Sequence, residues 1–320
     1  MTFTSLIKVA AMSAAFVCCA AQAQPVHVAT TAIVEHPALD AVRDGVKAVL
    51  EENGYRGGKM KFTYESAQGN SATAAQIARK LVGDQPDVIV AIATPSAQAV
   101  VSATQKIPVV FSVVTDPVGA KVVSSMRQPG GNVTGLSDMV NVEQHLALIQ
   151  EFLPHLKTLG IPYNPGEANS VSIVNAMKAA AKARGIKVVE SAAPKSSDVM
   201  VAVKQLVGKA DAVYCPTDNT IVSAFESVVK VGVEAQLPVF AADTGSVERG
   251  AVAAVGYNYG DLGRQTGEIV LRILKGAKPG SIDVKMAEGT ELFINTKMAA
   301  RMGVKVPPAA IKRAVKVIAN

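Results

Sequence analysis

Apolar and polar positions alternate along the chain in blocks that predict strands and helices in turn. Near-continuous apolar runs, such as 26–34 and 87–93, are rich in β-branched residues and predict strands. Between these runs lie segments such as 38–54 and 71–83, where apolar residues recur at helical spacing and a Gly stands at the end. Strands that are apolar throughout and separated by helices favour a parallel sheet covered on both faces.

The same order of elements is predicted twice. The first series comprises strand 26–34, helix 38–54, strand 59–67, helix 71–83, strand 87–93, helix 96–106 and strand 107–114. The second comprises strand 158–164, helix 168–185, strand 186–193, helix 196–208, strand 210–217, helix 219–236 and strand 237–243. The two series align around Leu81-Val82-Gly83 and Leu206-Val207-Gly208. We therefore predict an α/β protein of two similar lobes, each a parallel sheet with helices on both faces.

A chain of 320 residues is long enough for two domains. A polar, Gly-rich segment at 127–141 separates the two series and is typical of a last strand running into a crossover. The segments after about residue 257 could return to either lobe. The division we expect gives 24–140 plus about 258–285 to lobe 1, and 141–257 plus about 286–320 to lobe 2.

The first 23 residues have the pattern of a cleaved secretory signal peptide. Lys8 is their only charge, a short apolar run follows it, and Ala-Gln-Ala ends at Ala23. Cys18 and Cys19 raise the alternative of a lipoprotein, but the residues before them do not resemble a lipobox. We therefore expect export to the periplasm.

Composition narrows the class of partner. Removal of the signal leaves Cys215 as the single cysteine, so the mature chain forms no internal disulfide, and a strand-end Cys is expected to be a small buried hydrophobe. The formal charge is +6, and the residues after Glu291 are basic without any acid. Because no aromatic residues are interleaved there, a solvated basic face is favoured over a nucleic-acid patch.

Short polar loops follow the predicted strands and begin the helices. In an open parallel sheet, ligands bind beyond the carboxyl ends of the strands. Ser, Thr, Asp and Asn are also the preferred helix N-caps, so each loop alone is explained by capping. All the loops should nevertheless lie at one end of their sheets, where two facing lobes would form a cleft. They are Glu35–Asp40, Thr94–Ala97, Thr115–Pro117, Tyr163–Ser170, Thr217–Thr220 and Asp243–Ser246.

Enzyme signatures do not occur in the sequence. It has no G-x-S-x-G, no G-x-G-x-x-G after the first strand and no P-loop. The four His show no metal-ligand spacing, and His145 and His155 are expected on the surface of one amphipathic helix. His36 is the exception because it lies in the first cleft loop. We predict no metal, no cofactor and no enzymatic activity.

Two lobes, crossovers and export together resemble a known family. The chain resembles the solute-binding proteins of ATP-driven importers with the type I periplasmic-binding fold, in the branch that includes tryptophan/tyrosine-type binders. The resemblance is carried by segments 35–40, 93–99, 108–120, 129–138, 163–170, 211–219 and 256–267. The chain departs from the family at Pro162, which interrupts a usually uniform apolar strand and implies a kink or an edge position.

The resemblance implies a bilobed receptor, expected as a monomer, that binds a small amino-acid-like solute, plausibly aromatic, by hinge closure and passes it to a membrane permease. In the division of labour that we expect, Thr94, Ser96, Ala97 and Thr115 hold the ligand carboxylate and Asp218, with Asn219, takes the ammonium. Tyr259 could stack on the ligand side chain. Further residues expected to shape the site are Glu35, His36, Asp116, Tyr163, Asn164, Glu167 and Asp243.

Three alternatives remain open. Type I lobes also bind nucleosides, purines and sugars, although the chain has no Trp and no Arg in the cleft loops. An exported hydrolase or isomerase could use Glu35 and His36 as acid and base, but it would need a nucleophile or a metal. A ligand-sensing receptor would have to signal through a separate partner.

Overall fold

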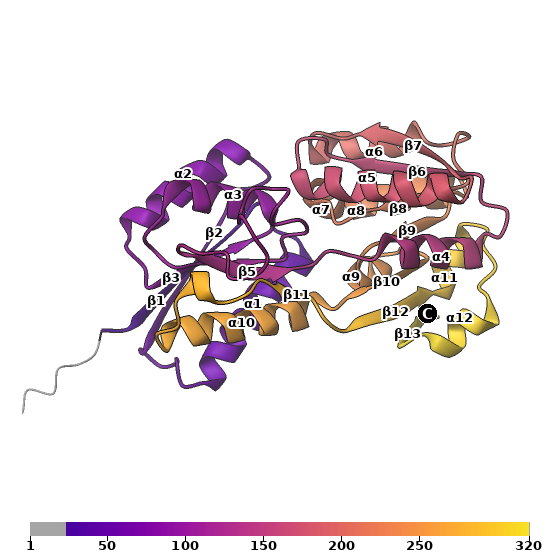
Figure 1. Ribbon diagram of the computed structural model, residues 1–320. Coiled ribbons are helices and arrows are strands. Elements are labelled where there is room, and N and C mark those ends of the chain that lie inside the picture. The colour runs from indigo at the N-terminus through magenta and orange to yellow at the C-terminus, as the bar shows by residue number, and fades with distance from the viewer. Residues whose placement is uncertain (1–23, 320) are drawn as a thin grey trace, which may run out of the picture.

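The computed structural model describes residues 24–319, and the expected signal peptide at 1–23 lies outside them. The described chain forms two α/β lobes that lie side by side (Figure 1). Each has one sheet with helices on both faces, so the predicted fold class is confirmed. Within the described part, no helix is long and apolar enough to cross a membrane.

Lobe 1 contains the first series of elements and returns later in the chain for one helix and one short strand. Its six-stranded sheet has the order β11-β5-β4-β3-β1-β2, and every pairing is parallel. The elements are β1 (Val26–Ala32), α1 (Pro37–Glu52), β2 (Met60–Ser66), α2 (Ser71–Gly83), β3 (Val88–Ile92), α3 (Thr94–Ala103), β4 (Val109–Ser112), β5 (Val133–Ser137), α10 (Tyr259–Leu274), the 3-10 turn η2 (Pro279–Ser281) and β11 (Lys285–Met286).

Lobe 2 has a seven-stranded sheet in the order β13-β12-β10-β9-β8-β6-β7. Its elements are α4 (Val142–Phe152), β6 (Thr158–Tyr163), α5 (Ala168–Ala183), β7 (Lys187–Ala192), η1 (Ser196–Asp198), α6 (Val199–Lys204), β8 (Ala212–Cys215), α7 (Asn219–Ser223), α8 (Phe225–Glu234), β9 (Val239–Ala241), α9 (Thr244–Glu248), β10 (Ala253–Tyr257), β12 (Thr290–Asn295), α11 (Thr296–Arg301), α12 (Pro308–Arg313) and β13 (Lys316–Ile318).

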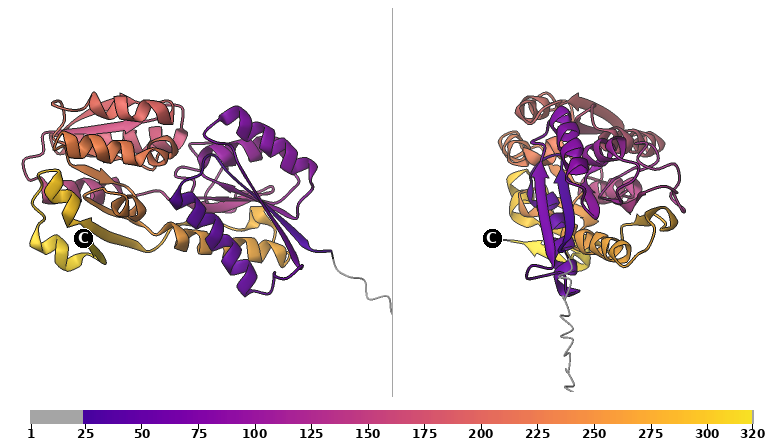
Figure 2. Two further views of the ribbon diagram at one scale, coloured as in Figure 1. Left: turned by 180° about the vertical axis from the view of Figure 1, so that it is seen from behind. Right: turned by 90° about the vertical axis from the view of Figure 1, so that its left-hand side faces the viewer.

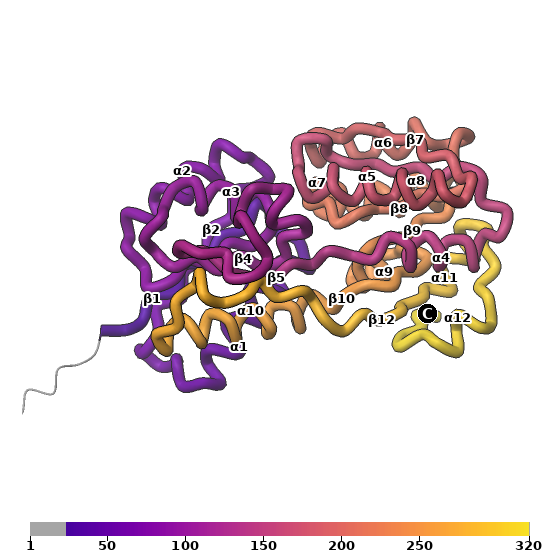
Figure 3. The backbone as a smooth tube through the Cα atoms, in the orientation of Figure 1, coloured from indigo at the N-terminus to yellow at the C-terminus, as the bar shows by residue number. Residues whose placement is uncertain are grey.

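The chain passes between the lobes three times, from β5 to α4, from β10 to α10 and from β11 to β12 (Figure 3). These passages explain the one departure from a parallel sheet, the antiparallel pairing of β10 with β12. β10 runs toward the other lobe and the chain leaves lobe 2 there. Because the chain re-enters lobe 2 from the same side, β12 runs back along β10 in the opposite direction.

Close helix packing fixes the shape of lobe 1. α1 and α10 lie together on one face of the sheet, and α2 and α3 lie together on the other (Figure 2). A Cβ added at Gly263 of α10 would lie 2.3 Å from the carbonyl oxygen of Val42 in α1. Glycine is therefore required for this approach. The contact places the first turns of α10 directly against α1.

Local expectations were met unevenly. Cys215 is buried at the end of β8 as predicted, and burial raises its pKa. His145 was expected on the surface but is buried, and its Nδ1 lies 2.7 Å from the Tyr214 hydroxyl. A kink or an edge position was expected at Pro162; β6 as a whole is internal, since it pairs with β7 and β8, but at Pro162 itself the described pairing is with β7 alone. The described pairing with β8 covers only Leu159 and Gly160 and stops before Pro162, which lacks an N–H to donate.

Candidate functional site

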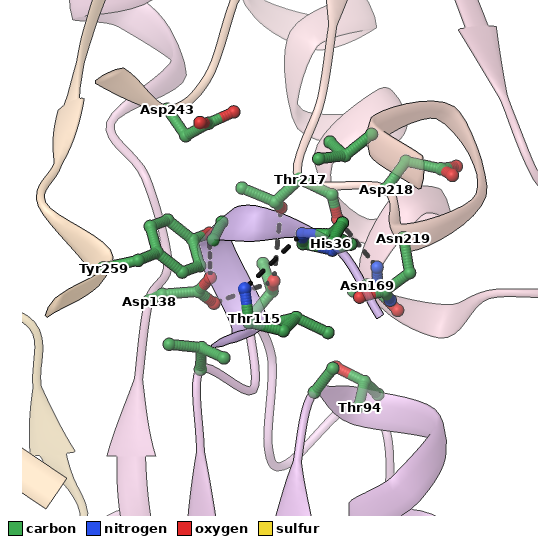
Figure 4. Close-up of a pocket in the computed structure, with 15 residues that line it drawn as sticks. His36, Thr94, Thr115, Asp138, Asn169, Thr217, Asp218, Asn219, Asp243 and Tyr259 are labelled. Carbon is green, nitrogen blue, oxygen red and sulfur yellow. Dashed lines mark hydrogen bonds between the residues drawn. The ribbon is translucent and has the colours of Figure 1, made fainter. Parts of the chain in front are cut away.

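A cavity of about 370 Å³, counted with its part open to solvent, lies between the lobes at the carboxyl ends of the strands. Lobe 1 and its crossovers contribute His36, Ala38, Leu39, Ala93, Thr94, Val113, Thr115, Asp138 and Tyr259. Lobe 2 contributes Asn169, Thr217, Asp218, Asn219, Val222 and Asp243 (Figure 4). Of the residues that the structure describes, no Lys or Arg lines this cavity.

The start of α3 forms part of the cavity wall in lobe 1. The N-cap residue Ala93 makes no side-chain cap hydrogen bond, and the first N–H groups of a helix have no partner within it. The hydroxyls of Thr94 and Ser96 are buried, and within residues 24–319 they have no hydrogen-bond partner. Free N–H groups at a helix start, with hydroxyl donors beside them, suit a carboxylate.

Backbone strain occurs in the same wall. Ala93 has φ +71° and Val113 has φ +50°, and both residues line the cavity. Positive φ is unfavourable for Ala and more so for the β-branched Val. Residues held in such conformations are over-represented at ligand sites, where the surrounding structure holds them.

Three buried carboxyl groups line the cavity, and burial raises the pKa of each. Asp218 Oδ1 accepts a hydrogen bond from Ile221 N at 2.8 Å and so caps α7. Asp243 likewise caps α9, because its Oδ1 accepts from Ser246 N at 2.8 Å. Asp138 caps no described helix and lies on the first crossover.

A hydrogen-bonded network in lobe 2 surrounds Asp218. Its Oδ2 accepts from the backbone N of Asn164 at 2.6 Å and from the hydroxyl of Ser170. The neighbouring Glu167 is also buried and accepts from the backbone N of both Asn219 and Thr220, at 3.1 Å each. Burial, and then the charge of Glu167, raise the pKa of Asp218 to about 7.

His36 enters the cavity from lobe 1 as a neutral ring. Its Nδ1 accepts from Leu39 N at 3.4 Å and caps α1. Burial, followed by the charge of Arg249, lowers the pKa of His36 to about 3. The imidazole is therefore a hydrogen-bonding group here and carries no charge near pH 7.

The structure brings together a large part of the predicted site. The predicted residues that line the cavity are His36, Thr94, Thr115, Asp218, Asn219, Asp243 and Tyr259. The predicted residues that do not line it are Glu35, Ser96, Ala97, Asp116, Tyr163, Asn164 and Glu167.

Several of the predicted residues that do not line the cavity lie in other environments. Glu35 is exposed, and the hydroxyl of Tyr163 donates to Glu190 at 2.9 Å. Asn164 and Glu167 line a neighbouring opening between the lobes. Asp116 accepts from Ser172 Oγ of the opposite lobe at 2.8 Å, which is a contact across the cleft.

Two of the groups that were expected to donate hydrogen bonds to the ligand carboxylate already donate to other atoms of the protein. Ala97 N donates to Ala93 O at 3.0 Å within α3, so this N–H is not free for a ligand. The hydroxyl of Thr115 donates to Asp138 Oδ1 at 3.0 Å. Each group has a single proton to donate, so the roles expected for Ala97 and Thr115 do not fit the geometry.

Asp138, Asn169 and Thr217 line the cavity and were not singled out as site residues, although Asn169 and Thr217 belong to two of the predicted cleft loops. Asp138 directly follows β5, so the rule that ligands bind beyond strand ends would have identified it had the segment not been regarded only as a crossover. Asn169 donates to Thr217 O at 2.7 Å, and its Oδ1 is buried without a partner. Among the residues described, no group of His, Cys, Asp and Glu could hold a metal ion.

Comparisons with known proteins agree with this architecture. Residues 27–318 match a family model described as ABC transporter substrate binding protein. The chain is 42% identical over 264 residues to a tyrosine-binding protein of Clostridioides difficile (strain R20291), which covers 82% of this chain and 76% of that protein. It superposes with a TM-score of 0.90, at 51% identity, on a conserved domain protein of Vibrio cholerae, covering 91% of this chain and 99% of that one.

Two further structures differ in how well they superpose. A structure from Streptococcus pneumoniae in complex with L-Trp gives a TM-score of 0.89 at 35% identity, covering 92% of this chain and 100% of that one. A ligand-free, open structure of a substrate-binding protein from Clostridium difficile gives 0.69 at 39% identity, with the same coverage. This chain therefore superposes less well on the ligand-free, open structure than on the L-Trp complex, although its sequence identity to the open structure is higher. The family model spans both lobes and all three passages between them, and the chain belongs to the family of ABC transporter substrate-binding proteins.

Proposed function

We propose that this protein binds an aromatic L-amino acid in the cavity between its lobes and delivers it to the permease of an ABC importer. The observation that carries the proposal is the pairing of an uncapped helix start with buried carboxyl groups and no lining Lys or Arg among the described residues. A zwitterion presents one charge to each kind of group, whereas a simple anion would meet three acidic side chains.

The relatives support the aromatic class. A protein 42% identical to this chain is named tyrosine-binding, and a structure 35% identical to it holds L-Trp. Apolar side chains line part of the cavity, among them Leu39, Val113 and Val222. These side chains suit a ring that leaves water on binding.

Within this proposal, the hydroxyl of Thr94 and the helix start behind it receive the ligand carboxylate. Ser96 lies in the first turn of α3 but does not line the cavity, so it is not assigned a contact with the ligand. Tyr259 lines the cavity and presents a ring that could contact the side chain of the ligand. Glu167 and Asn164 hold the lobe 2 side in shape through Asp218 and α7.

Closure about the three passages accompanies binding in this proposal. Thr115 Oγ1 and Thr217 Oγ1 lie 3.3 Å apart across the cleft, and Ser172 contacts Asp116. The chain superposes better on the L-Trp complex, with a TM-score of 0.89, than on the ligand-free, open relative, with 0.69, which supports a closed arrangement. A ligand that contacts both lobes favours the closed state by its differential affinity.

The mature protein acts as a monomer in the periplasm in this proposal, after removal of the expected signal peptide. The family is one of solute-binding proteins and not of enzymes, so the exported hydrolase or isomerase is set aside. A nucleoside, a purine or a sugar remains the second ligand class, because the fold also accommodates these.

Thermal shift and calorimetry test the ligand. Protein refolded to remove bound solute is titrated with each of the twenty amino acids, with nucleosides and with sugars. L-tyrosine or L-tryptophan at 100 times its Kd should stabilise the folded state by about 2.7 kcal/mol. Stabilisation by a nucleoside or a sugar, with no response to any amino acid, would overturn the proposal.

A further inference from the structure

The cavity contains more acid than one ammonium group needs. Asp138, Asp218 and Asp243 all line it, and all are at most 5% exposed. An amino-acid ligand carries a single ammonium group, whose one positive charge balances only one of the three carboxylates. Their hydrogen-bond partners distinguish them.

Asp218 and Asp243 each accept a hydrogen bond from the first turn of the helix that they cap. Asp218 accepts from two backbone N–H groups and one hydroxyl, all in lobe 2. Asp243 accepts from Ser246 N at 2.8 Å and from Ser246 Oγ at 2.6 Å. Backbone N–H groups at a helix start satisfy a carboxylate well, because the helix dipole adds to the hydrogen bonds. Both groups therefore have a structural role without any ligand.

Helix capping does not explain why Asp138 is buried at the cavity. Its Oδ1 accepts from Thr115 Oγ1 at 3.0 Å, and its Oδ2 accepts from Tyr259 OH at 2.8 Å. Both donors are neutral side chains, and no cationic side chain among the described residues contributes to its pKa, which burial raises. Two carboxylate oxygens can accept about four hydrogen bonds, so Asp138 keeps acceptor capacity at the cavity.

The position of Asp138 also matters. It follows β5 on the first passage between the lobes, whereas Tyr259 begins α10 directly after the second passage. A second bond joins the same two segments, since Tyr257 OH donates to Met139 O at 3.1 Å. Figure 4 shows Asp138 grouped with Thr115 and Tyr259, while Asp218 points away toward α7.

A buried carboxylate held only by neutral donors is costly unless a cation compensates it. We propose that Asp138, and not Asp218, receives the ammonium group of the amino-acid ligand. Thr115 and Tyr259 are positioning residues that fix the two carboxylate oxygens. The assignment rests on the proposed function, and it replaces the role that the sequence suggested for Asp218.

The test compares Asp138→Asn with Asp218→Asn on two ligands, by calorimetry. One ligand is L-tyrosine, and the other is 3-(4-hydroxyphenyl)propionate, which lacks the ammonium group. Asp138→Asn should weaken L-tyrosine binding by about 100-fold, because the buried charge pair is lost. Its affinity for 3-(4-hydroxyphenyl)propionate should be unchanged or higher, since no carboxylate then faces an uncharged position. Retained binding of that analogue also shows that the variant is folded.

Each outcome is decisive. An equal loss on both ligands, or no loss on L-tyrosine, overturns the assignment. A selective loss of L-tyrosine binding in Asp218→Asn instead returns the ammonium role to Asp218. If the wild-type protein binds neither L-tyrosine nor L-tryptophan, the proposed function fails and this assignment fails with it. Tyr259→Phe is a second variant, expected to weaken L-tyrosine binding by about 3–10-fold while the analogue is unaffected, because a single hydroxyl bond to the carboxylate is removed.

Discussion

The starts of α3 in lobe 1 and α7 in lobe 2 occupy equivalent places in the two lobes but are built differently. α3 has no side-chain cap, its N-cap Ala93 has φ +71°, and two hydroxyls at its start have no partner. α7 is capped by Asp218 in relaxed extended backbone, with φ −115°. Glu167 adds a second carboxylate that accepts from its N–H groups.

The difference shows which helix start is free to bind a ligand. The N–H groups of α7 are satisfied by side chains of lobe 2, so a ligand carboxylate there would compete with two buried acids. At the start of α3, the hydroxyls of Thr94 and Ser96 have no partner among the described residues, and the backbone of Ala93 is strained. A repeated fold thus gives both lobes the same architecture, while capping leaves the start of α3, and not that of α7, open to an anion.

Among the substitutions that test this difference between α3 and α7, Thr94→Val should have the largest effect on ligand affinity. The substitution removes a hydroxyl that is buried and unpartnered without ligand, so the stability of the ligand-free protein should not fall. A hydrogen bond to a charged group is worth about 1.5–3 kcal/mol, so affinity for L-tyrosine should drop by about 10–100-fold. Calorimetry and thermal unfolding measure the two quantities.

Thr31→Val is the matched control for Thr94→Val. The hydroxyl of Thr31 is also buried and unpartnered, but it does not line the cavity. This variant should behave like Thr94→Val in unfolding and like the wild type in binding. Equal affinity in both variants would show that the start of α3 does not hold the carboxylate.

The capped helix of lobe 2 predicts a pH dependence. The pKa of Asp218 is raised from 3.8 to about 7, so the folded state binds a proton more tightly than the unfolded state. The stability from this group is fully present below about pH 4 and is lost as the pH rises to about 7, by at most about 1.4 kcal/mol per pH unit.

Denaturant unfolding of the ligand-free protein between pH 4 and 8 measures this loss. In Asp218→Asn, the free energy of unfolding should decrease less steeply with pH than in the wild type, because the titrating carboxyl group is absent. Glu167→Gln should move the loss to lower pH, because the charge of Glu167 is one cause of the raised pKa. If the free energy of unfolding depends on pH equally in the wild type and in Asp218→Asn, a raised pKa of Asp218 is not a cause of that dependence.

The location of the site could be predicted from the sequence because it follows from topology. The carboxyl ends of parallel strands meet at one edge of a sheet, and His36, Thr94 and Asp243 follow predicted strands and line the cavity. Asp138 obeys the same rule and was missed only because its strand was regarded as the entry to a crossover. The order of elements and the two lobes were predictable from periodicity alone.

The roles of the site residues could not be predicted in the same way. Glu167 is 52 residues from Asn219 along the chain, yet it accepts the first N–H of α7. Such contacts decide which carboxylates are already satisfied, and no local pattern reports them. His145 shows the same limit, because its burial depends on Tyr214, 69 residues away.

The smallest effect is expected at the N-cap of α3 itself, from Ala93→Gly. Ala93 has φ +71° and ψ +158°, a region that is open to Gly and costs other residues about 1–3 kcal/mol. Gly removes that strain but loses more conformational entropy on folding, about 0.5–1 kcal/mol. The two terms oppose each other, so the free energy of unfolding should rise by about 0–2.5 kcal/mol.

The affinity of Ala93→Gly for L-tyrosine tests whether the strained backbone at Ala93 contributes to ligand binding. If the conformation at Ala93 only positions the N–H groups of α3, the more mobile Gly should weaken L-tyrosine binding by a few-fold while the protein becomes slightly more stable. Gln236→Gly is a matched control, because Gln236 also has positive φ, at 49°, and lies outside the cavity. It should gain stability without any change in affinity. Equal affinities in all three proteins would mean that the strained cap of lobe 1 serves packing alone, and the contrast with α7 would then rest on the unpartnered hydroxyls of Thr94 and Ser96.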